Sequence, residues 1–166
     1  MKTLLIMLVI VSFAFAGESE FGILAGMAKP TGDDIDNYVA ASFFLGGQYI
    51  AHQKSYAIEG SARYIMLKAD NDFEDDDFSG SLMSIAGGVR GYSNSLYSCG
   101  GLEMDFLSVE VDDIEYVDES EIGLYAGVGF VTPFGATNDL DLSLRYHLYD
   151  FETDNAFISF GGGVNF

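Results

Sequence analysis

Residues 139–149, DLDLSLRYHLY, combine possible catalytic side chains with strict alternation of polar and apolar residues. Successive side chains of a strand point to opposite faces. One face carries leucines and Tyr146, and the other carries Asp141, Ser143, Arg145 and His147. A serine, a histidine and a carboxylate within reach of one another are the residue types of nucleophilic acyl transfer. A buried hydrogen-bond network is the alternative interpretation of the same residues, and it is the one we favour.

Two acidic runs, DNDFEDDDF (70–78) and EVDDIEYVDE (110–119), are candidate cation sites, because hard cations take carboxylate oxygens. The possible ligands in the first run are Asp72, Asp75, Asp76 and Asp77. The run lacks the spaced D-x-[DN]-x-[DN]-G frame of a calcium loop and its distal glutamate. The sequence therefore favours solvated acidic loops, with weak collective cation binding as the alternative.

Period-two alternation recurs along the chain after residue 16, whereas no segment has a convincing helical stripe. It predicts eight strands, near residues 21–27, 38–50, 57–68, 81–91, 96–109, 121–131, 139–149 and 158–166. An even number of strands is typical of a closed antiparallel membrane barrel from bacteria.

The connections between these strands alternate between long and short. The long ones are 30–37, 70–78, 110–121 and 150–155, and the short ones are 52–55, 93–95 and 132–138. Strand direction reverses each time, so all the long connections lie at one end of the sheet. They hold 19 of the 26 acidic residues, and the short connections hold none. Long outer loops opposite short periplasmic turns are typical of bacterial membrane barrels.

The first 16 residues have the pattern of a secretory signal peptide. Lys2 precedes an apolar stretch that runs to residue 16, and Ala14-Phe15-Ala16 supplies small residues for cleavage. The apolar run is too short to cross a bilayer comfortably as a helix. We therefore expect a leader over residues 1–16 and a single mature domain over residues 17–166.

Charge and composition exclude some classes of protein. The mature domain keeps all 26 acidic residues and loses only one of the seven bases, which excludes the basic footprint of a nucleic-acid-binding protein. An apolar content of 49% is too high for a disordered acidic chain. Cys99 is the only cysteine, so no intrachain disulfide stabilises the domain.

The polar face of the strands decides which way the apolar face points. It is rich in Gly, Ser and Ala, and small residues suit a narrow barrel lumen better than a solvent-exposed surface. Its ionisable residues carry both signs, and they are Glu59, Arg63, Arg90, Glu103, Asp105, Glu121, Asp141, Arg145 and His147. Opposite charges can pair in a lumen, and eight strands leave room only for side chains. We therefore expect a lipid-facing apolar surface around a charge network that fills the lumen.

These features resemble the small eight-stranded outer-membrane barrels of Gram-negative bacteria, the OmpA/OmpX-like proteins. In that family the last strand ends in an aromatic residue after alternating apolar positions and is read by the barrel-assembly machinery. The strand ISFGGGVNF (158–166) fits the pattern. The resemblance implies an assembly signal made of Phe160, Gly162, Val164 and Phe166.

The sequence thus predicts an all-β, eight-stranded antiparallel up-and-down transmembrane β-barrel in the outer membrane of a Gram-negative bacterium. We expect a non-enzymatic protein whose acidic extracellular loops serve surface interaction, adhesion or envelope integrity. The alternatives are a lipid-modifying enzyme, a small-solute porin and a soluble barrel that binds a ligand. Barrel lipid A deacylases place Ser and His on the lipid-facing rim, whereas Ser143 and His147 are expected in the lumen. The expected partners are outer-membrane lipid and lipopolysaccharide, the barrel-assembly machinery and an unidentified extracellular ligand; we expect no cofactor, no metal centre and no nucleic acid.

Overall fold

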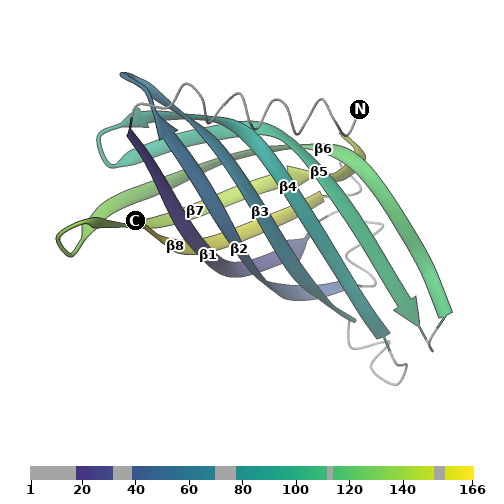
Figure 1. Ribbon diagram of the computed structural model, residues 1–166. Helices are drawn as coiled ribbons and strands as arrows, with labels where there is room; N and C mark the ends of the chain where they lie inside the picture. Colours follow the sequence, from purple (N-terminus) through teal and green to yellow (C-terminus); the bar gives the residue numbers. More distant parts are fainter. Residues whose placement is uncertain (1–17, 32–38, 70–77, 112–113, 152–155) are drawn as a thin grey trace.

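The chain folds into a closed barrel in which every strand pairs with its sequence neighbours and β8 returns to β1 (Figure 1). The computed structural model describes residues 18–31, 39–69, 78–111, 114–151 and 156–166. The strands are β1 (Glu18–Pro30), β2 (Val39–His52), β3 (Tyr56–Ala69), β4 (Phe78–Ser93), β5 (Leu96–Val111), β6 (Ile114–Phe134), β7 (Asn138–Leu148) and β8 (Ala156–Asn165). A short 3-10 turn, η2 (Tyr149–Phe151), follows β7. The predicted fold class, an eight-stranded antiparallel up-and-down barrel, is confirmed.

The two ends of the barrel differ in their connections. The turns at 53–55, 94–95 and 135–137 lie at one end, which we call the turn end. The strand ends next to residues 32–38, 70–77, 112–113 and 152–155 lie at the other, which we call the loop end. No helix within the described residues is long and apolar enough to cross a membrane.

The seam of the barrel joins the first and last strands. β1 and β8 pair antiparallel from Gly22 opposite Asn165 to Pro30 opposite Phe157. The backbone N–H of Phe166 donates to the Phe21 carbonyl at 2.8 Å, so pairing continues to the last residue. Closure satisfies the backbone groups that an open edge strand would leave unpaired.

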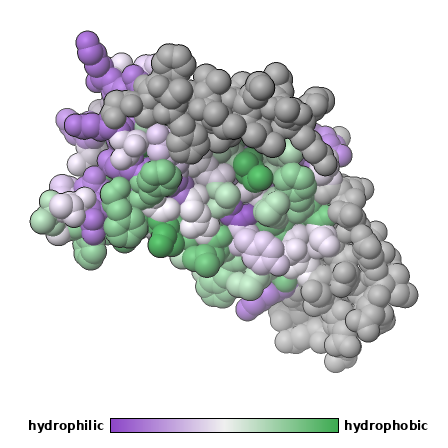
Figure 2. All heavy atoms as spheres, viewed as in Figure 1, coloured by the Kyte–Doolittle hydropathy of each residue, from purple (hydrophilic) through white to green (hydrophobic). Residues whose placement is uncertain are grey.

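The strand surfaces are apolar outside and polar inside, as predicted. Outward-facing Phe21, Phe43 and Phe160 are 50–60% exposed, whereas the lumen-facing Arg90 is fully buried. In Figure 2, hydrophobic side chains cover much of the described surface on the face shown. This is the reverse of a water-soluble barrel, in which the apolar face points inward.

The structure corrects the predicted connection over residues 110–121. β5 continues to Val111 and β6 already begins at Ile114, so the strands form a long hairpin that extends beyond β7 at the loop end (Figure 1). The acidic composition suggested a loop, but valine and isoleucine, which favour strands, are interleaved with the acids. The predicted connection at 132–138 is shorter as well, because β6 continues to Phe134.

The turn end is closed by tight connections. Ser93 pairs with Leu96, which leaves a two-residue turn in which Asn94 has a φ of 58°. Asparagine tolerates this left-handed conformation better than most residues, which suits it to a two-residue hairpin. The β6–β7 turn uses Gly135 at a φ of 81° for the same reason.

Candidate functional site

The lumen at the turn end is filled by a network centred on Glu59. Its carboxylate accepts hydrogen bonds from both Arg145 terminal nitrogens at 3.1 Å each and from the Tyr125 hydroxyl at 2.6 Å. Arg90 Nε donates to the same carboxylate. Two guanidinium groups therefore share one carboxylate that is 3% exposed.

Asp141 is the second carboxylate of this network. It accepts hydrogen bonds from Arg90 Nη1 and the Tyr97 hydroxyl, both at 2.7 Å, and from Gln48 Nε2 at 3.1 Å. Gln48 also bonds Arg90 and Asn165. The turn-end network thus comprises Gln48, Glu59, Arg90, Tyr97, Tyr125, Asp141, Arg145 and Asn165. Two guanidinium groups balance two carboxylates, and this pairing limits the cost of burying charge. Within the described residues, Arg145 Nε and Asn165 Nδ2 are the two buried nitrogens of this network without a hydrogen-bond partner.

Two lumen-facing glycines make room for the tyrosines of this network. A Cβ at Gly129 would overlap the Tyr97 ring, and a Cβ at Gly88 would overlap the Tyr125 hydroxyl. Tyr97 and Tyr125 also lie under the guanidinium groups of Arg90 and Arg145, at 4.3 and 5.2 Å from ring centroid to Cζ. The small residues of the polar face therefore allow large side chains from other strands to cross the lumen.

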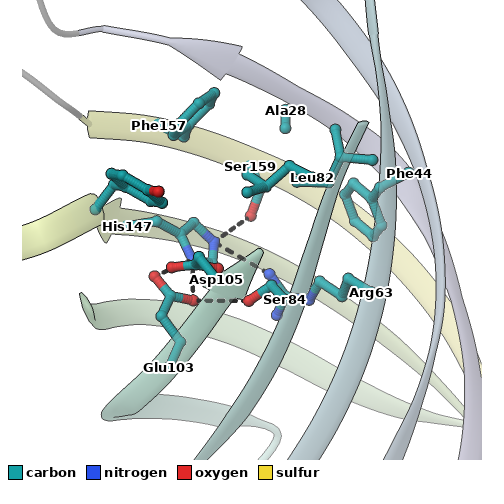
Figure 3. A pocket seen from close by; sticks show the side chains of 12 residues that line it. Ala28, Phe44, Arg63, Leu82, Ser84, Glu103, Asp105, His147, Phe157 and Ser159 are labelled. Carbon is teal, nitrogen blue, oxygen red and sulfur yellow. Dashed lines mark hydrogen bonds and ion pairs between the residues drawn. The ribbon is translucent and has the colours of Figure 1, made fainter. Parts of the chain in front are cut away.

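A second cluster, centred on His147, lies nearer the loop end (Figure 3). His147 Nδ1 is 2.8 Å from Glu103 Oε2, and its Nε2 is 2.8 Å from Ser159 Oγ and 3.1 Å from Arg63 Nη1. Because a guanidinium group only donates, we assign Nε2 as the acceptor and place the ring hydrogen on Nδ1, which donates to Glu103. We define the loop-end cluster as Arg63, Ser84, Glu103, Asp105, His147 and Ser159.

Apolar side chains cover the loop-end cluster inside the lumen. They are Leu24, Ala28, Phe44, Ile65, Leu67, Leu82, Tyr149 and Phe157. A cavity of about 20 Å³ lies between these side chains and the polar cluster, which is room for about one water molecule. The predicted lumen was polar, and this apolar layer is the main feature that the sequence did not reveal.

The structure brings together all but one of the ionisable residues that the sequence placed in the lumen. The exception is Glu121, which is half-buried opposite Asp105 at the edge of the loop-end cluster. Cys99 is buried in the lumen as a free thiol. The acidic residues Asp72, Asp75, Asp76 and Asp77 lie outside the described residues, and so does the predicted leader, 1–16.

The assembly signal implied by the resemblance lies on the outward face of β8. Phe160 and Phe166 are 60% and 59% exposed, and Gly162 and Val164 lie between them on the same face. β8 pairs with both β7 and β1, so this row of residues is at the seam. Its role in assembly stays a prediction.

The predicted proximity of Ser143 to His147 does not lead to a hydrogen bond, because His147 bonds Ser159 of the next strand instead. The order Ser159–His147–Glu103 has the connectivity of a nucleophile, a general base and an orienting acid. However, Ser159 is 4% exposed and borders a cavity with space for one water molecule. A substrate carbonyl does not fit there, so the geometry supports a structural hydrogen-bond chain.

Alternation contained a signal for the residues that were missed. Gln48, Tyr125, Ser159 and Asn165 all stand at lumen-facing positions of their strands. Only charged groups and histidine were predicted as members of the lumen network, whereas these neutral side chains supply many of its hydrogen bonds.

A closed barrel with an apolar outside and a bonded polar interior defines a class: the chain has the fold of the small eight-stranded outer-membrane β-barrels. Neisserial surface protein A is similar, with a TM-score of 0.60 and 18% identity over 89% of this chain and 95% of that one. The attachment invasion locus protein Ail of Yersinia pestis also has a TM-score of 0.60 and 18% identity, and the match covers 91% of this chain and 98% of that one. A major outer membrane protein from Thermus thermophilus has a TM-score of 0.64 and 11% identity, and the match covers 90% of this chain and 99% of that one. No protein-family model matches the sequence, and no curated protein is significantly similar to it.

Proposed function

We propose that this chain is a non-enzymatic outer-membrane barrel that presents acidic loops outside the cell for surface interaction, adhesion or envelope integrity. The observation that carries the proposal is the reversed distribution of polarity, with exposed hydrophobic side chains outside and buried ion pairs inside. In water, such a large apolar surface would promote association. In a bilayer the same surface faces hydrocarbon, and barrel closure leaves no unpaired backbone edge there.

The orientation follows from the connections and the expected leader. Outer-membrane barrels have short periplasmic turns and longer extracellular loops. The loop end, with most of the acidic residues, would thus face the outside of the cell, after export by a signal peptide cleaved behind Ala16. Adhesion is supported by analogy alone, since one protein of similar fold is an attachment invasion locus protein.

The lumen argues against the porin alternative. Arg90 and Arg145 are fully or almost fully buried and bond carboxylates from other strands across the interior. Conduction through the described part of the barrel would require these ion pairs to separate without new partners, which is costly inside a protein.

A lipid-modifying enzyme is the second candidate, and the Ser159–His147–Glu103 chain is the observation that favours it. The test is the lipid profile of cells that produce the Ser159→Ala variant, with Ser143→Ala as a matched control. Our proposal expects unchanged lipids in both variants, whereas loss of a lipid modification only in Ser159→Ala would establish the enzyme.

Accessibility on intact cells tests the proposed topology. Epitope tags at 70–78 and at 112–113, between β5 and β6 in the sequence, should be labelled from outside the cell. A tag at 93–95, in the β4–β5 turn, should be labelled only after permeabilisation. Labelling of 93–95 on intact cells would overturn the topology, and recovery of the protein in the soluble periplasm without detergent would overturn the membrane location.

The terminal strand allows a test of assembly. Deleting Phe166 removes an outward aromatic side chain and the two backbone hydrogen bonds to Phe21 that extend the seam to the last residue. We expect the truncated chain to be exported but to insert poorly, as measured by the fraction that migrates as a heat-modifiable band. Phe166→Tyr keeps the backbone and an aromatic ring and should insert normally, whereas normal insertion of the truncated chain would refute an assembly role.

A further inference from the structure

The outward surface of the strands carries two charged side chains, Lys29 and Lys68, wherever side chains are described. The three described arginines are buried in the lumen, and Lys54 lies in a turn at the turn end. In such an acidic chain, the exposed positive charge on the barrel wall is therefore confined to two neighbouring positions.

Both lysines lie at the loop end of the wall. Lys29 is one residue from the end of β1, and Lys68 is one residue from the end of β3. β2 lies between these strands, with Ala40 directly opposite Lys68 and Ser42 opposite Ala28. Since neighbouring strands are about 4.8 Å apart, the two lysine backbones are about 10 Å apart across β2. Both flexible side chains can thus reach one ligand or two adjacent groups of the same ligand.

Apolar side chains cover the wall just below the lysines. Lys68 Nζ lies 5.4 Å from the centroid of the Phe43 ring. Phe43, Met27 and Met66 are 44–54% exposed on the same three strands. An ammonium group next to exposed hydrocarbon is complementary to an amphiphile that has an anionic head group and acyl chains. A surface that faces only water would not need the exposed hydrocarbon.

We propose that Lys29, Lys68 and the Phe43 ring form a binding site for the phosphate-bearing head group of an outer-leaflet lipid. The inference rests on the proposed membrane function and deepens it by naming the lipid contact. Neither ammonium group is ion-paired with a carboxylate in the described ranges. A lysine near an anionic membrane surface adds about a factor of five in affinity, so the pair supplies about 25-fold. The two ammonium groups would also place positive charge between the lipid phosphate and the acidic loops.

The experiment measures lipid binding to the full mature chain refolded in detergent, by native mass spectrometry. The probes are lipid A, its dephosphorylated form and inorganic phosphate. The variants are Lys29→Gln/Lys68→Gln, the charge-preserving Lys29→Arg/Lys68→Arg, and Lys54→Gln, which removes another exposed lysine at the opposite end. Heat-modifiable migration verifies that each variant is folded.

We expect the natural chain to prefer phosphorylated lipid, and the double glutamine variant to lose about 25-fold in affinity for it. Lys54→Gln and the double arginine variant should bind as the natural chain does. Equal binding of both lipid forms by the natural chain, or unchanged affinity of the double glutamine variant, would overturn the inference. So would displacement of the lipid by equimolar inorganic phosphate, which would indicate a site for the free anion.

The measurement also separates this inference from the membrane proposal. If the natural chain inserts into phosphatidylcholine vesicles but shows no preference for phosphorylated lipid, only the lysine site is wrong. If the natural chain does not insert into vesicles at all, the proposed function itself is wrong. If the double glutamine variant is less stable yet binds lipid normally, the lysines pair with carboxylates of the chain and the inference is refuted.

Discussion

The two halves of the lumen are filled on different principles. At the turn end, two guanidinium groups and two carboxylates form a balanced network whose hydrogen bonds run between β2, β3, β4, β5, β6, β7 and β8. At the loop end, one guanidinium group and one imidazole face two carboxylates under a layer of apolar side chains. Ion pairs stabilise the turn-end region, whereas apolar packing contributes more to the stability of the loop-end region.

The two regions also differ in how completely their side chains are surrounded by partners. A buried charge is tolerated only if it is paired and hydrogen-bonded, and the turn-end network meets that requirement with tyrosines and Gln48 as additional partners. The loop-end cluster borders a cavity of about 20 Å³, so its side chains have fewer neighbours on one side. We therefore expect the turn end to be the more rigid half and the loop end to tolerate more substitutions.

The largest effect is expected for Glu59→Gln. The substitution preserves shape but leaves Arg90 and Arg145 with one carboxylate fewer, and breaking a buried ion pair costs about 3–5 kcal/mol. The measurement is the free energy of unfolding in urea for protein refolded into lipid vesicles.

Glu103→Gln is the matched control in the loop-end cluster. Its amide oxygen can still accept from His147, so we expect a loss of about 1–2 kcal/mol, the range of one weakened hydrogen bond. If the two substitutions lower the free energy of unfolding by the same amount, the proposed contrast between a turn end stabilised by ion pairs and a loop end stabilised by packing is wrong.

The second prediction concerns packing at the loop end. Phe44 is 5% exposed inside the lumen, whereas its neighbour Phe43 is 50% exposed on the wall. Phe44→Ala would enlarge the existing cavity and should cost about 3–4 kcal/mol. Phe43→Ala should cost about 1 kcal/mol or less in vesicles, because lipid replaces its contacts. Comparable losses in the same urea unfolding measurement would show that the apolar layer does not stabilise the lumen.

Alternation in the sequence predicts the fold and the composition of the network to a large extent. A period of two assigns each residue to a face, so Glu59, Arg90 and Arg145 could be placed in the lumen before their contacts were known. Alternation does not predict how far along the lumen a residue lies or which residue it bonds. Gln48 and Asp141 are 93 residues apart in the sequence and meet only because the barrel closes. For the same reason the apolar layer around Phe44 was missed, since no strand contributes more than two of its residues and the layer forms only when several strands meet in the closed barrel.

The smallest effect is expected for the hydrogen-bond chain through His147. Ser159→Ala removes one buried hydrogen bond to Nε2, while the bonds from Arg63 and to Glu103 remain, so the loss should be about 1 kcal/mol. Ser143→Ala, at a half-buried position, should change the unfolding free energy by about 0.5 kcal/mol or less. A catalytic serine would behave differently, because its replacement abolishes turnover while often leaving stability unchanged. A stable Ser159→Ala variant that no longer modifies lipid would therefore identify the loop-end cluster as a reaction site, and a small stability loss with unchanged lipids identifies it as part of the packed interior.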